Sequence, residues 1–441
     1  MHVARKVTPV QLAIIADDLS SCTDCGIQLA RNGLRTYVVL DRHRDIGHLG
    51  TCDVVAVDTD SRACAAGDAY RRVAEATRFV QGACTAVYKS VDSTLRGNLG
   101  SEVDAVMDVI AFDIAAIAPA FPLYGRTTVA GTQYVHGRRI DLTEFASDPQ
   151  MPVTEASVPS AFASQSGRRV GHVGLDTLHD GNAAVRARVM ELQQDGVELV
   201  IFDAQSEDDL DVIVSGVTSS GFRVLWVGST GLAGHLSVTM NTAARTPATG
   251  VNHEGSGAPI LSVVGSASQI TREQVAAYVR QAAASSVRMD PVRIIEGLRL
   301  RDREIKRCCR HVLEELRSGR DVVLEVLSSR EDIAATQALG RRKDLNGSQA
   351  GVELVRSLAE ICASVIERIE VGGLILTGGD TARAVCDRLR ARGILILREV
   401  EPGIPLARIV GPHEVAIVTK AGGFGSPDAL LLAGRLLKGG R

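Results

Sequence analysis

Aromatic residues and net charge are both scarce in this chain of 441 residues. Phenylalanine, tryptophan and tyrosine together make up 3% of it, and the formal net charge is -3 at pH 7. Proteins that bind nucleic acids or anionic membranes usually present an extended basic surface, which this composition does not supply. We therefore expect neither a nucleic acid nor a membrane as the main partner.

Long apolar runs and a secretion signal are also missing from the sequence. No stretch approaches the roughly 20 apolar residues that a membrane-spanning helix needs. The nine cysteines are an odd number in a long chain, which is typical of reduced, cytoplasmic proteins. Cys22 and Cys25 form a C-x-x-C pair, but no second pair has metal-ligand spacing. Small buried thiols are therefore the favoured interpretation of these cysteines.

Several widespread catalytic motifs are absent as well. The sequence has no G-x-x-x-x-G-K-[ST] phosphate loop, no protein-kinase loop set, no H-E-x-x-H and no G-x-S-x-G. Gly423-Phe424-Gly425 begins like a dinucleotide fingerprint, but Asp428 stands in the place of the third glycine. This departure disfavours an oxidoreductase of the Rossmann type.

The length and the pattern of apolar residues indicate two α/β domains. Apolar residues make up 45% of the chain and charged residues 23%, and 441 residues exceed what one ordinary core organises. Short apolar runs alternate with helical patterns from residue 12 to residue 240, and again from residue 260 to residue 437. Such alternation is typical of parallel sheets covered by helices. We predict two domains, each a mostly parallel sheet flanked by helices.

The predicted domain boundary lies in a segment without an apolar period. Residues 242–258 are rich in Thr, Ala, Gly, Ser and Asn, which is a composition typical of linkers. The N-terminal domain is therefore predicted to span residues 1–241 and the C-terminal domain residues 259–441. Within the first domain, residues 131–166 lose the regular alternation, and no pattern is assigned to most of them.

The densest group of polar side chains follows the apolar run at residues 85–88. Residues 89–98 read K-S-V-D-S-T-L-R-G-N, with a lysine, an aspartate, three hydroxyls and an arginine within eight residues. Lys89 and Arg96 could meet a carboxylate or a phosphate, and Asp92 could orient a hydroxyl or accept its proton. The alternative is a solvated turn with a helix N-cap and a local ion pair. The polar density alone does not separate these two interpretations.

Other predicted strand ends in the first half also carry acids and bases. Asp17 and Asp18 follow the apolar run at 12–16, and Arg126 lies beyond the run at 114–118. Two adjacent carboxylates facing one pocket repel each other, so we expect a metal, a pair of substrate hydroxyls or Lys89 to offset them. These groups favour the binding of a small, acidic, hydroxylated molecule.

In the second half, three predicted strand ends run into turns rich in Gly, Ser and Thr, at residues 265–268, 377–381 and 420–426. Such turns let backbone N–H groups approach a phosphate, and the helix that follows adds about half a positive charge. A single turn of this kind can use glycine for geometry alone, but three together favour a nucleotide. An acid on one side and a nucleotide on the other predict phosphoryl transfer, which usually employs Mg²⁺.

Seven separated segments of the chain resemble the four-carbon acid sugar kinase family. They are A-D-D-L at 16–19, T-D at 23–24, residues 89–98, A-P-A-F-P with G-R-T-T at 118–128, P-V-T-E at 152–155, and residues 377–381 and 419–425. The resemblance implies an N-terminal sugar-acid-binding domain and a C-terminal nucleotide-binding domain. It also implies ATP-dependent phosphorylation of D-threonate, D-erythronate or 3-oxo-tetronate at the terminal hydroxyl.

The resemblance and the strand-end chemistry together define the expected site. The candidate catalytic residues, one of which is expected to be the general base, are Asp17, Asp18 and Asp92. The expected substrate-binding residues are Asp24, Lys89, Ser93, Arg96 and Arg126. The expected ATP-binding residues are Ser266, Ser268, Gly378, Gly379, Asp380, Thr381, Gly422 and Gly423. ATP and Mg²⁺ are the expected cofactors; Asp380 is an alternative for the base or the Mg²⁺ role, and the sequence does not identify the metal ligands.

One departure from the family pattern bears on the choice of substrate. Ser20-Ser21-Cys22 stand where many members read Thr-Gly-Ala, and the loss of a glycine there could alter the first loop. The sequence therefore leaves the sugar acid open. Two other classes of function also stay open: a metal-dependent hydrolase or aldolase acting on a sugar phosphate, and a non-catalytic sugar-acid sensor. A cytoplasmic location is expected, and a homodimer is compatible with the sequence.

Overall fold

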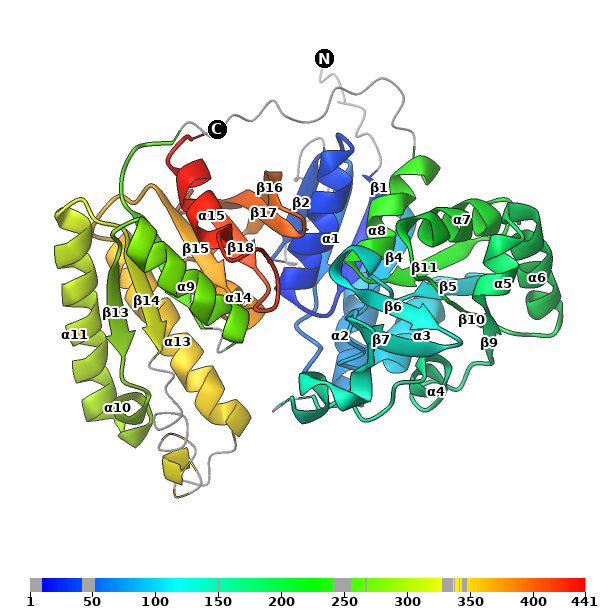
Figure 1. The fold of residues 1–441 in the computed structure, drawn as a ribbon, viewed down its shortest axis with the longest axis horizontal. Coiled ribbons are helices and arrows are strands. Elements are labelled where there is room, and N and C mark those ends of the chain that lie inside the picture. Colours follow the sequence, from blue (N-terminus) through cyan, green and yellow to red (C-terminus); the bar gives the residue numbers. More distant parts are fainter. Residues whose placement is uncertain are drawn as a thin grey trace, which may run out of the picture. The chain divides into compact units, whose positions relative to one another are not determined.

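Short apolar strands alternate with helices throughout the part of the chain that the computed structural model describes. This part comprises residues 10–41, 52–148, 151–240, 255–265, 268–326 and 347–440, with a few helical residues between 336 and 342. The chain divides into two units, Met1–Ala248 and Thr249–Arg441, whose elements are labelled in Figure 1. The predicted linker at 242–258 lies outside the described residues except for 255–258.

The first unit is built on a parallel sheet of eight strands in the order β2-β3-β1-β4-β11-β5-β10-β9. Its strands are β1 (Val10–Ala16), β2 (Thr36–Val39), β3 (Val54–Asp58), β4 (Cys84–Ser90), β5 (Ile114–Ala118), β9 (Val170–Val173), β10 (Leu199–Phe202) and β11 (Val224–Gly228). The central strands are buried along almost their whole length, because helices cover both faces of a parallel sheet. This burial explains why their sequences read as continuous apolar runs.

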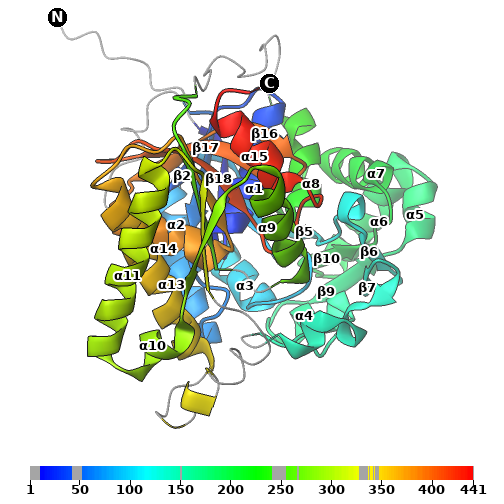
Figure 2. The ribbon, with the colours of Figure 1, turned by 60° about the vertical axis from the view of Figure 1, so that its left-hand side comes forward.

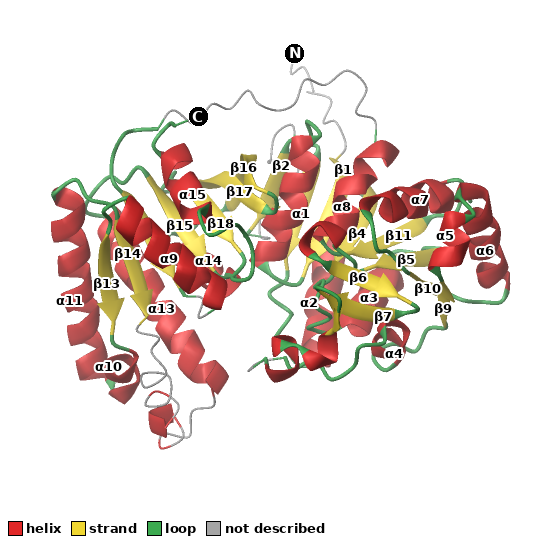
Figure 3. Cartoon of the chain, in the orientation of Figure 1, coloured by secondary structure: helices red, strands yellow, loops and turns green. Residues whose placement is uncertain are grey.

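The helices of the first unit pack in two groups. One group contains α1 (Leu19–Arg31), α5 (Leu175–His179), α6 (Asn182–Gln194), α7 (Glu207–Thr218) and α8 (Thr230–His235), and the other α2 (Ala66–Val80), α3 (Leu99–Val109) and α4 (Val158–Ala163). Figure 3 shows these helices in red against the yellow strands. A small antiparallel sheet of β6 (Arg126–Val129), β7 (Thr132–Val135) and β8 (Arg138–Arg139) forms where the predicted alternation broke down.

The second unit contains a mixed sheet of seven strands in the order β13-β14-β12-β15-β18-β17-β16. Its first five strands are parallel, and β17 runs antiparallel to both β18 and β16. The strands are β12 (Ile260–Val264), β13 (Ser285–Met289), β14 (Val322–Val326), β15 (Gly373–Thr377), β16 (Gly393–Glu401), β17 (Ile404–Val410) and β18 (Ala416–Lys420). The predicted α/β class with mostly parallel sheets is confirmed, although the hairpin of β16 and β17 was not predicted.

The helices of the second unit also form two groups. Helices α9 (Gln269–Gln281) and α15 (Ala429–Leu437) pack together, as do α10 (Pro291–Glu296), α11 (Leu298–Arg317), α13 (Gly347–Ile366) and α14 (Gly379–Arg388). Figure 2 shows α11 and α13 lying side by side. No helix in the described part of the chain has the length and apolar character needed to cross a membrane.

Candidate functional site

The paired aspartates at the end of β1 share one arginine from the end of β3. Arg62 donates from Nε and Nη2 to the two carboxylate oxygens of Asp17, at 2.7 and 2.9 Å. Its Nη1 reaches Asp18 Oδ2 at 2.6 Å, and Nη2 also donates to Ser21 Oγ at 2.8 Å. Strands β1 and β3 are neighbours, so their carboxyl ends bring these residues together. Arg62 therefore offsets the repulsion of the two carboxylates, a role that the sequence had left to a metal, the substrate or Lys89.

Asp18 also begins the helix that carries Ser21. Its Oδ1 accepts the backbone N–H of Ser21 at 2.7 Å, which is the hydrogen bond expected of an N-cap residue. The first turn of α1 is therefore regular, and the absence of a glycine at residue 21 does not distort it. What the serine adds instead is a hydroxyl in contact with Arg62.

The loop after β4 forms a second ionic cluster beside the first. Arg96 Nε donates to Asp92 Oδ2 at 2.6 Å, and Thr94 Oγ1 donates to the same oxygen at 2.5 Å. Burial alone would raise the pKa of Asp92, but the charges of Arg96 and Arg62 and these hydrogen bonds outweigh it, so the net pKa is lowered. Gly97 lies where this loop approaches Arg62 closely, since a Cβ there would be 3.4 Å from the arginine Cγ.

Lys89 does not face an open surface. Its side chain is fully buried, and its Nζ lies 2.7 Å from Glu102 Oε2 and donates to the carbonyl of Ser90 at 2.5 Å. Ser61 donates to the other oxygen of Glu102 at 2.6 Å. Burial raises the pKa of Glu102, although the ammonium and both hydrogen bonds oppose that shift. Lys89 thus fixes the end of β4 to helix α3 in this conformation.

The remaining predicted substrate residues surround these clusters. Arg126, at the start of β6, is buried, donates to the carbonyl of Tyr124 at 3.1 Å and lies within electrostatic range of Asp92. Burial lowers the pKa of this arginine. Ser93 is buried and its carbonyl accepts from Gln133 at 2.8 Å, while Asp24 is buried in α1.

In the second unit, three glycine-containing turns follow three neighbouring strands, β12, β15 and β18. The N–H of Gly265 donates to the carbonyl of Thr377 at 3.3 Å, and the N–H of Gly378 donates to that of Lys420 at 2.9 Å. A Cβ at Gly265 would lie 1.9 Å from the hydroxyl oxygen of Thr381, so any side chain there would require Thr381 to move. The turns predicted to bind phosphate are therefore hydrogen-bonded to one another.

The predicted ATP-binding residues occupy these turns and the helices that begin at them. Gly378 has a φ of +94°, a conformation that favours glycine, and Gly379 and Asp380 open helix α14. Ser268 caps α9, and its Oγ donates to the carbonyl of Gly422 at 2.6 Å. Thr381 is buried against Gly265, and Gly423 borders open space. Ser266 lies outside the described residues.

Lys420, at the end of β18, is a residue that the sequence analysis missed. It is 1% exposed, and its Nζ donates to the carbonyls of Ala421 at 2.9 Å and Phe424 at 3.0 Å. A third carbonyl, that of Gly422, lies 3.3 Å away. A lysine as the last residue of a strand that enters a glycine turn is the signal by which Lys420 could have been found.

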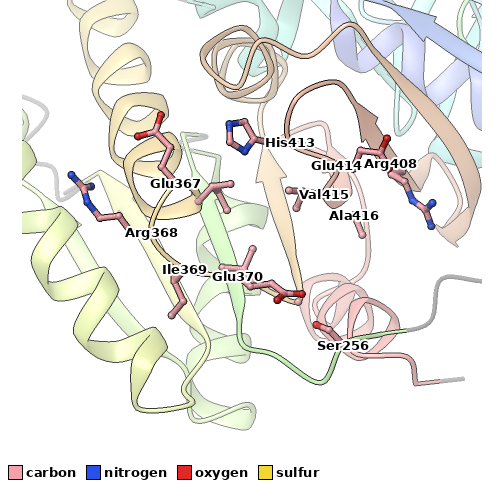
Figure 4. Close-up of a pocket in the computed structure, with 13 residues that line it drawn as sticks. Ser256, Glu367, Arg368, Ile369, Glu370, Arg408, His413, Glu414, Val415 and Ala416 are labelled. Carbon is pink, nitrogen blue, oxygen red and sulfur yellow. The ribbon is translucent and has the colours of Figure 1, made fainter.

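The described residues contain no group of three or more His, Cys, Asp or Glu side chains arranged to hold a metal ion. Cys22 and Cys25 are buried free thiols, as predicted. A cavity of about 710 Å³ lies in the second unit beside Arg368, Arg408 and His413 (Figure 4). Its lining includes the residues at the amino ends of β15 and β18, so it is at the opposite edge of the sheet from the glycine turns.

Comparison with known protein families matches both halves of the chain. Residues 12–236 match the model of a sugar-binding N-terminal domain, and residues 261–430 match that of a nucleotide-binding C-terminal domain. These assignments agree with the chemistry of the two sheet edges, where the first offers charged side chains and the second glycine turns.

Curated relatives match nearly the whole chain. A D-erythronate kinase of Heliobacterium modesticaldum is 33% identical over 95% of both chains. A D-threonate kinase of Salmonella typhimurium is also 33% identical, over 96% of this chain and 97% of its own. A 3-oxo-tetronate kinase of Cupriavidus necator is 29% identical over 95% of both.

A solved structure has the same fold. It is a Salmonella typhimurium LT2 protein described as a putative tRNA synthase, with a TM-score of 0.79 and 26% sequence identity over 97% of this chain and 99% of its own. The likeness therefore extends over both units rather than over one of them.

Proposed function

Because the chain belongs to the four-carbon acid sugar kinase family, we propose that it transfers the terminal phosphoryl group of ATP to the terminal hydroxyl of a four-carbon sugar acid. D-threonate, D-erythronate and 3-oxo-tetronate are the candidate acceptors, since relatives named for these three acids match nearly the whole chain. A relative named for D-erythronate is 33% identical and relatives named for D-threonate are 31–34% identical, so sequence identity does not choose between those two acids.

The observation that carries this proposal is the contrast between the two sheet edges. The edge in the first unit presents ionised side chains, which suit a small molecule with a carboxylate and several hydroxyls. The edge in the second unit presents three joined glycine turns, which suit phosphate groups. Phosphoryl transfer needs both kinds of site, together with accurate positioning of the two substrates.

On the acceptor side, we assign the carboxylate of the sugar acid to Arg96 and Arg126. Both are arginines, whose planar guanidinium can bind a carboxylate with two hydrogen bonds. Asp17 and Asp18, held in place by Arg62, are assigned to the hydroxyls. Lys89, Ser93 and Asp24, all of them buried, are proposed to complete the substrate-binding set.

The general base is proposed among the three strand-end aspartates. Arg96 and Arg62 keep the pKa of Asp92 low, and a carboxylate with a low pKa is a weak base. Asp17 and Asp18 are therefore preferred, and Asp18 is the more accessible of the two, with its side chain 21% exposed against 3% for Asp17. Asp380 remains the alternative in the second unit.

On the donor side, ATP is assigned to the three glycine turns. The proposed contacts come from Ser266, Ser268, Gly378, Gly379, Asp380, Thr381, Gly422 and Gly423. Mg²⁺ is proposed as the usual companion of ATP, where it neutralises charge on the transferred phosphate. The carboxylate of Asp380, in the first turn of α14, supplies the hard oxygen ligand that Mg²⁺ prefers.

A substrate panel tests this function. The purified chain is incubated with ATP, Mg²⁺ and each four-carbon acid in turn, and ADP release is measured. We expect ADP with at least one of D-threonate, D-erythronate and 3-oxo-tetronate. A sugar phosphate consumed without ADP would instead identify the hydrolase or aldolase, and binding of acid and nucleotide without turnover would identify the sensor.

The same panel tests the role of Ser21. Ser21→Gly removes the hydroxyl that contacts Arg62, and the helix around it is regular. We expect this variant to change the ratio of kcat/KM values among the three acids by roughly 3- to 10-fold, the effect of about one hydrogen bond. An unchanged ratio would show that the hydroxyl does not touch the acid.

The domain limits, the location and the assembly also stay as proposals. We propose a sugar-acid-binding domain at residues 1–241, a linker at 242–258 and a nucleotide-binding domain at 259–441. We also propose that the protein is cytoplasmic and forms a homodimer. Light scattering of the purified protein measures its molar mass in solution and so tests the homodimer directly.

A further inference from the structure

We propose that Lys420 is a positioning residue for nucleotide binding: its buried ammonium turns the carbonyls of the glycine turn at 421–425 inward and so directs the neighbouring N–H groups outward, toward phosphate. The inference rests on the proposed function, since it concerns the ATP site. Lys420 differs in this from a phosphate-loop lysine, which contacts the nucleotide itself.

Lys420 lies beneath the turn rather than in front of it. The residue is 1% exposed, and three carbonyls of the turn, those of Ala421, Gly422 and Phe424, lie 2.9, 3.3 and 3.0 Å from its Nζ. A lysine ammonium has three N–H donors, so it can bind several of these carbonyls at once. The three carbonyls come from one short loop and converge on the same ammonium, an arrangement that an ordinary strand-to-helix connection does not require.

Side chains at the start of helix α9 also donate hydrogen bonds to the carbonyls of this turn. The Gly422 carbonyl accepts from Ser268 Oγ at 2.6 Å and from Thr271 Oγ1 at 3.0 Å. Gln274 Nε2 donates to the carbonyls of Phe424 and Ser426 at 3.1 and 2.8 Å. Lys420 Nζ also donates to Thr271 Oγ1 at 3.4 Å, which joins the lysine to the helix. The inward face of the turn is therefore lined with donors.

Because peptide bonds are planar, the orientation of these carbonyls also fixes the orientation of the N–H groups that follow them. In a trans peptide, the C=O and the N–H that follows it point to opposite sides. No cis peptide occurs in the described chain. With the Ala421 and Gly422 carbonyls facing Lys420, the N–H groups of Gly422 and Gly423 face away from it. A Cβ built at Gly423 would meet no atom within 4 Å, so the space at that residue is open.

Outward N–H groups at an open glycine make a surface that accepts a phosphate, because each N–H can donate to a phosphate oxygen. Lys420 contributes to this surface without touching the ligand. Its replacement is thus expected to loosen the turn and to weaken nucleotide binding, while the sugar-acid site in the other unit keeps its geometry.

The main test is Lys420→Met in the full chain, with calorimetric titration of ATP and ADP and steady-state kinetics for both substrates. Methionine keeps the length and removes the charge and the donors. We expect the Kd for ATP and for ADP to rise by a similar factor, on the order of 10- to 100-fold, as for the loss of several hydrogen bonds to a charged group. KM for ATP should rise while KM for the sugar acid changes less than about 2-fold.

Two further variants keep the test decisive if Lys420→Met folds poorly. Thr271→Val preserves shape and removes the hydroxyl that joins Lys420 to Gly422; Thr271 is fully buried, so it cannot contact ATP. We expect a roughly 3- to 10-fold weaker Kd for ATP from this change. Gly423→Ala places a methyl group in the open space and should weaken ATP binding without lowering the melting temperature. The effects of Thr271→Val and Gly423→Ala on the Kd for ATP should be non-additive, because both changes act on the N–H group of Gly423.

A matched control removes a lysine elsewhere in the same unit. Lys438 pairs with Asp321 at 2.8 Å, away from the turn, so Lys438→Met should change stability and leave the Kd for ATP unaltered. Equal affinity for ATP in wild type and Lys420→Met would overturn this inference and leave the proposed function standing. Weaker binding of ATP with unchanged binding of ADP would also overturn it, because that result indicates direct contact between Lys420 and the terminal phosphate. Equal rises in KM for both substrates would also overturn it. A wild-type chain that binds no nucleotide would overturn the proposed function, and this inference with it.

Discussion

A buried lysine stands at a strand end in each unit, and the two lysines hold different partners. Lys89, at the end of β4, forms an ion pair with Glu102 at 2.7 Å. Lys420, the last residue of β18, donates to backbone carbonyls of the turn that follows it. The first lysine ties a strand to a helix through a side chain, whereas the second shapes the main chain itself.

The same contrast extends to the candidate sites. In the first unit, Asp17, Asp18, Asp92, Arg62 and Arg96 satisfy one another through their side chains. In the second unit, the turns are held by hydrogen bonds to carbonyls and leave glycine N–H groups outward. Side chains can distinguish one sugar acid from another by the number and place of its hydroxyls, while backbone N–H groups bind the phosphates that every nucleotide carries. The difference teaches where to look for specificity: in the first unit.

The largest effect is expected from Arg62→Ala. This change removes the guanidinium that joins Asp17 and Asp18, so the buried carboxylate of Asp17 and the partly buried one of Asp18 would lose the charge that offsets them. We expect kcat/KM to fall by roughly 10²- to 10⁴-fold and the free energy of unfolding to fall by about 3–5 kcal/mol, as for other broken buried ion pairs. Steady-state kinetics and urea unfolding measure the two losses.

Arg168 offers a matched control for Arg62. It also pairs with several carboxylates, those of Asp104, Asp108 and Glu198, but it lies next to the amino ends of β9 and β10. Arg168→Ala should therefore lower stability and leave kcat/KM within about 2-fold of wild type, since activity depends on the carboxyl edge. If the two variants lost activity equally, Arg62 would have no special part in the site.

The buried pair of the first unit gives the next largest effect. Lys89→Met and Glu102→Leu each leave one buried charge without its partner, so each should lower the free energy of unfolding by about 3–5 kcal/mol. The double variant should be much less destabilised than the sum of the two, because an apolar pair has no charge to desolvate. Urea unfolding of the four proteins completes the cycle, and additive losses would show that the pair is not coupled.

A smaller loss is expected at Gly265, where the backbone of one turn lies against the side chain of Thr381. A methyl group at Gly265 would lie 1.9 Å from the hydroxyl oxygen of Thr381, so Gly265→Ala must displace the buried side chain of Thr381 or the turn that carries residue 265. We expect about 1–3 kcal/mol of destabilisation, typical of overpacking, and a rise in KM for ATP. Gly67→Ala is the control, because a Cβ there meets nothing within 4 Å. The double variant Gly265→Ala with Thr381→Ser keeps the hydroxyl against which the new methyl group packs. We therefore expect it to remain less stable than wild type.

The sequence predicted the fold class and the edges that carry the candidate sites, because periodicity and glycine turns are local signals. It did not predict β16 and β17, although they are neighbours in the chain and pair with each other as an antiparallel hairpin. Arg62 and Lys420 were missed for other reasons. Arg62 follows a different strand from the aspartates it binds. Lys420 acts on the main chain, and the sequence shows it only as a lysine that ends a strand before a glycine turn. Lys89, prominent in sequence, proved to be buried against Glu102, a partner 13 positions further along the chain.

The smallest effect is a pH dependence at Asp92. Its pKa is lowered in the folded chain, so its ionised form contributes stability at pH values above the unfolded pKa of about 3.9, and the contribution is lost as the pH falls below that value. Asp92→Asn should cost about 1–2 kcal/mol at pH 7. The gap from wild type should start to narrow at about pH 5 and keep narrowing as the pH falls toward the lowered pKa of the folded state, because over this range the unfolded carboxylate takes up its proton first. Asp141→Asn is the control, because Asp141 pairs with the half-exposed Arg139 and such surface pairs contribute about 0–1 kcal/mol. A gap for Asp92→Asn that stayed constant with pH would show that Asp92 contributes through packing rather than through its charge.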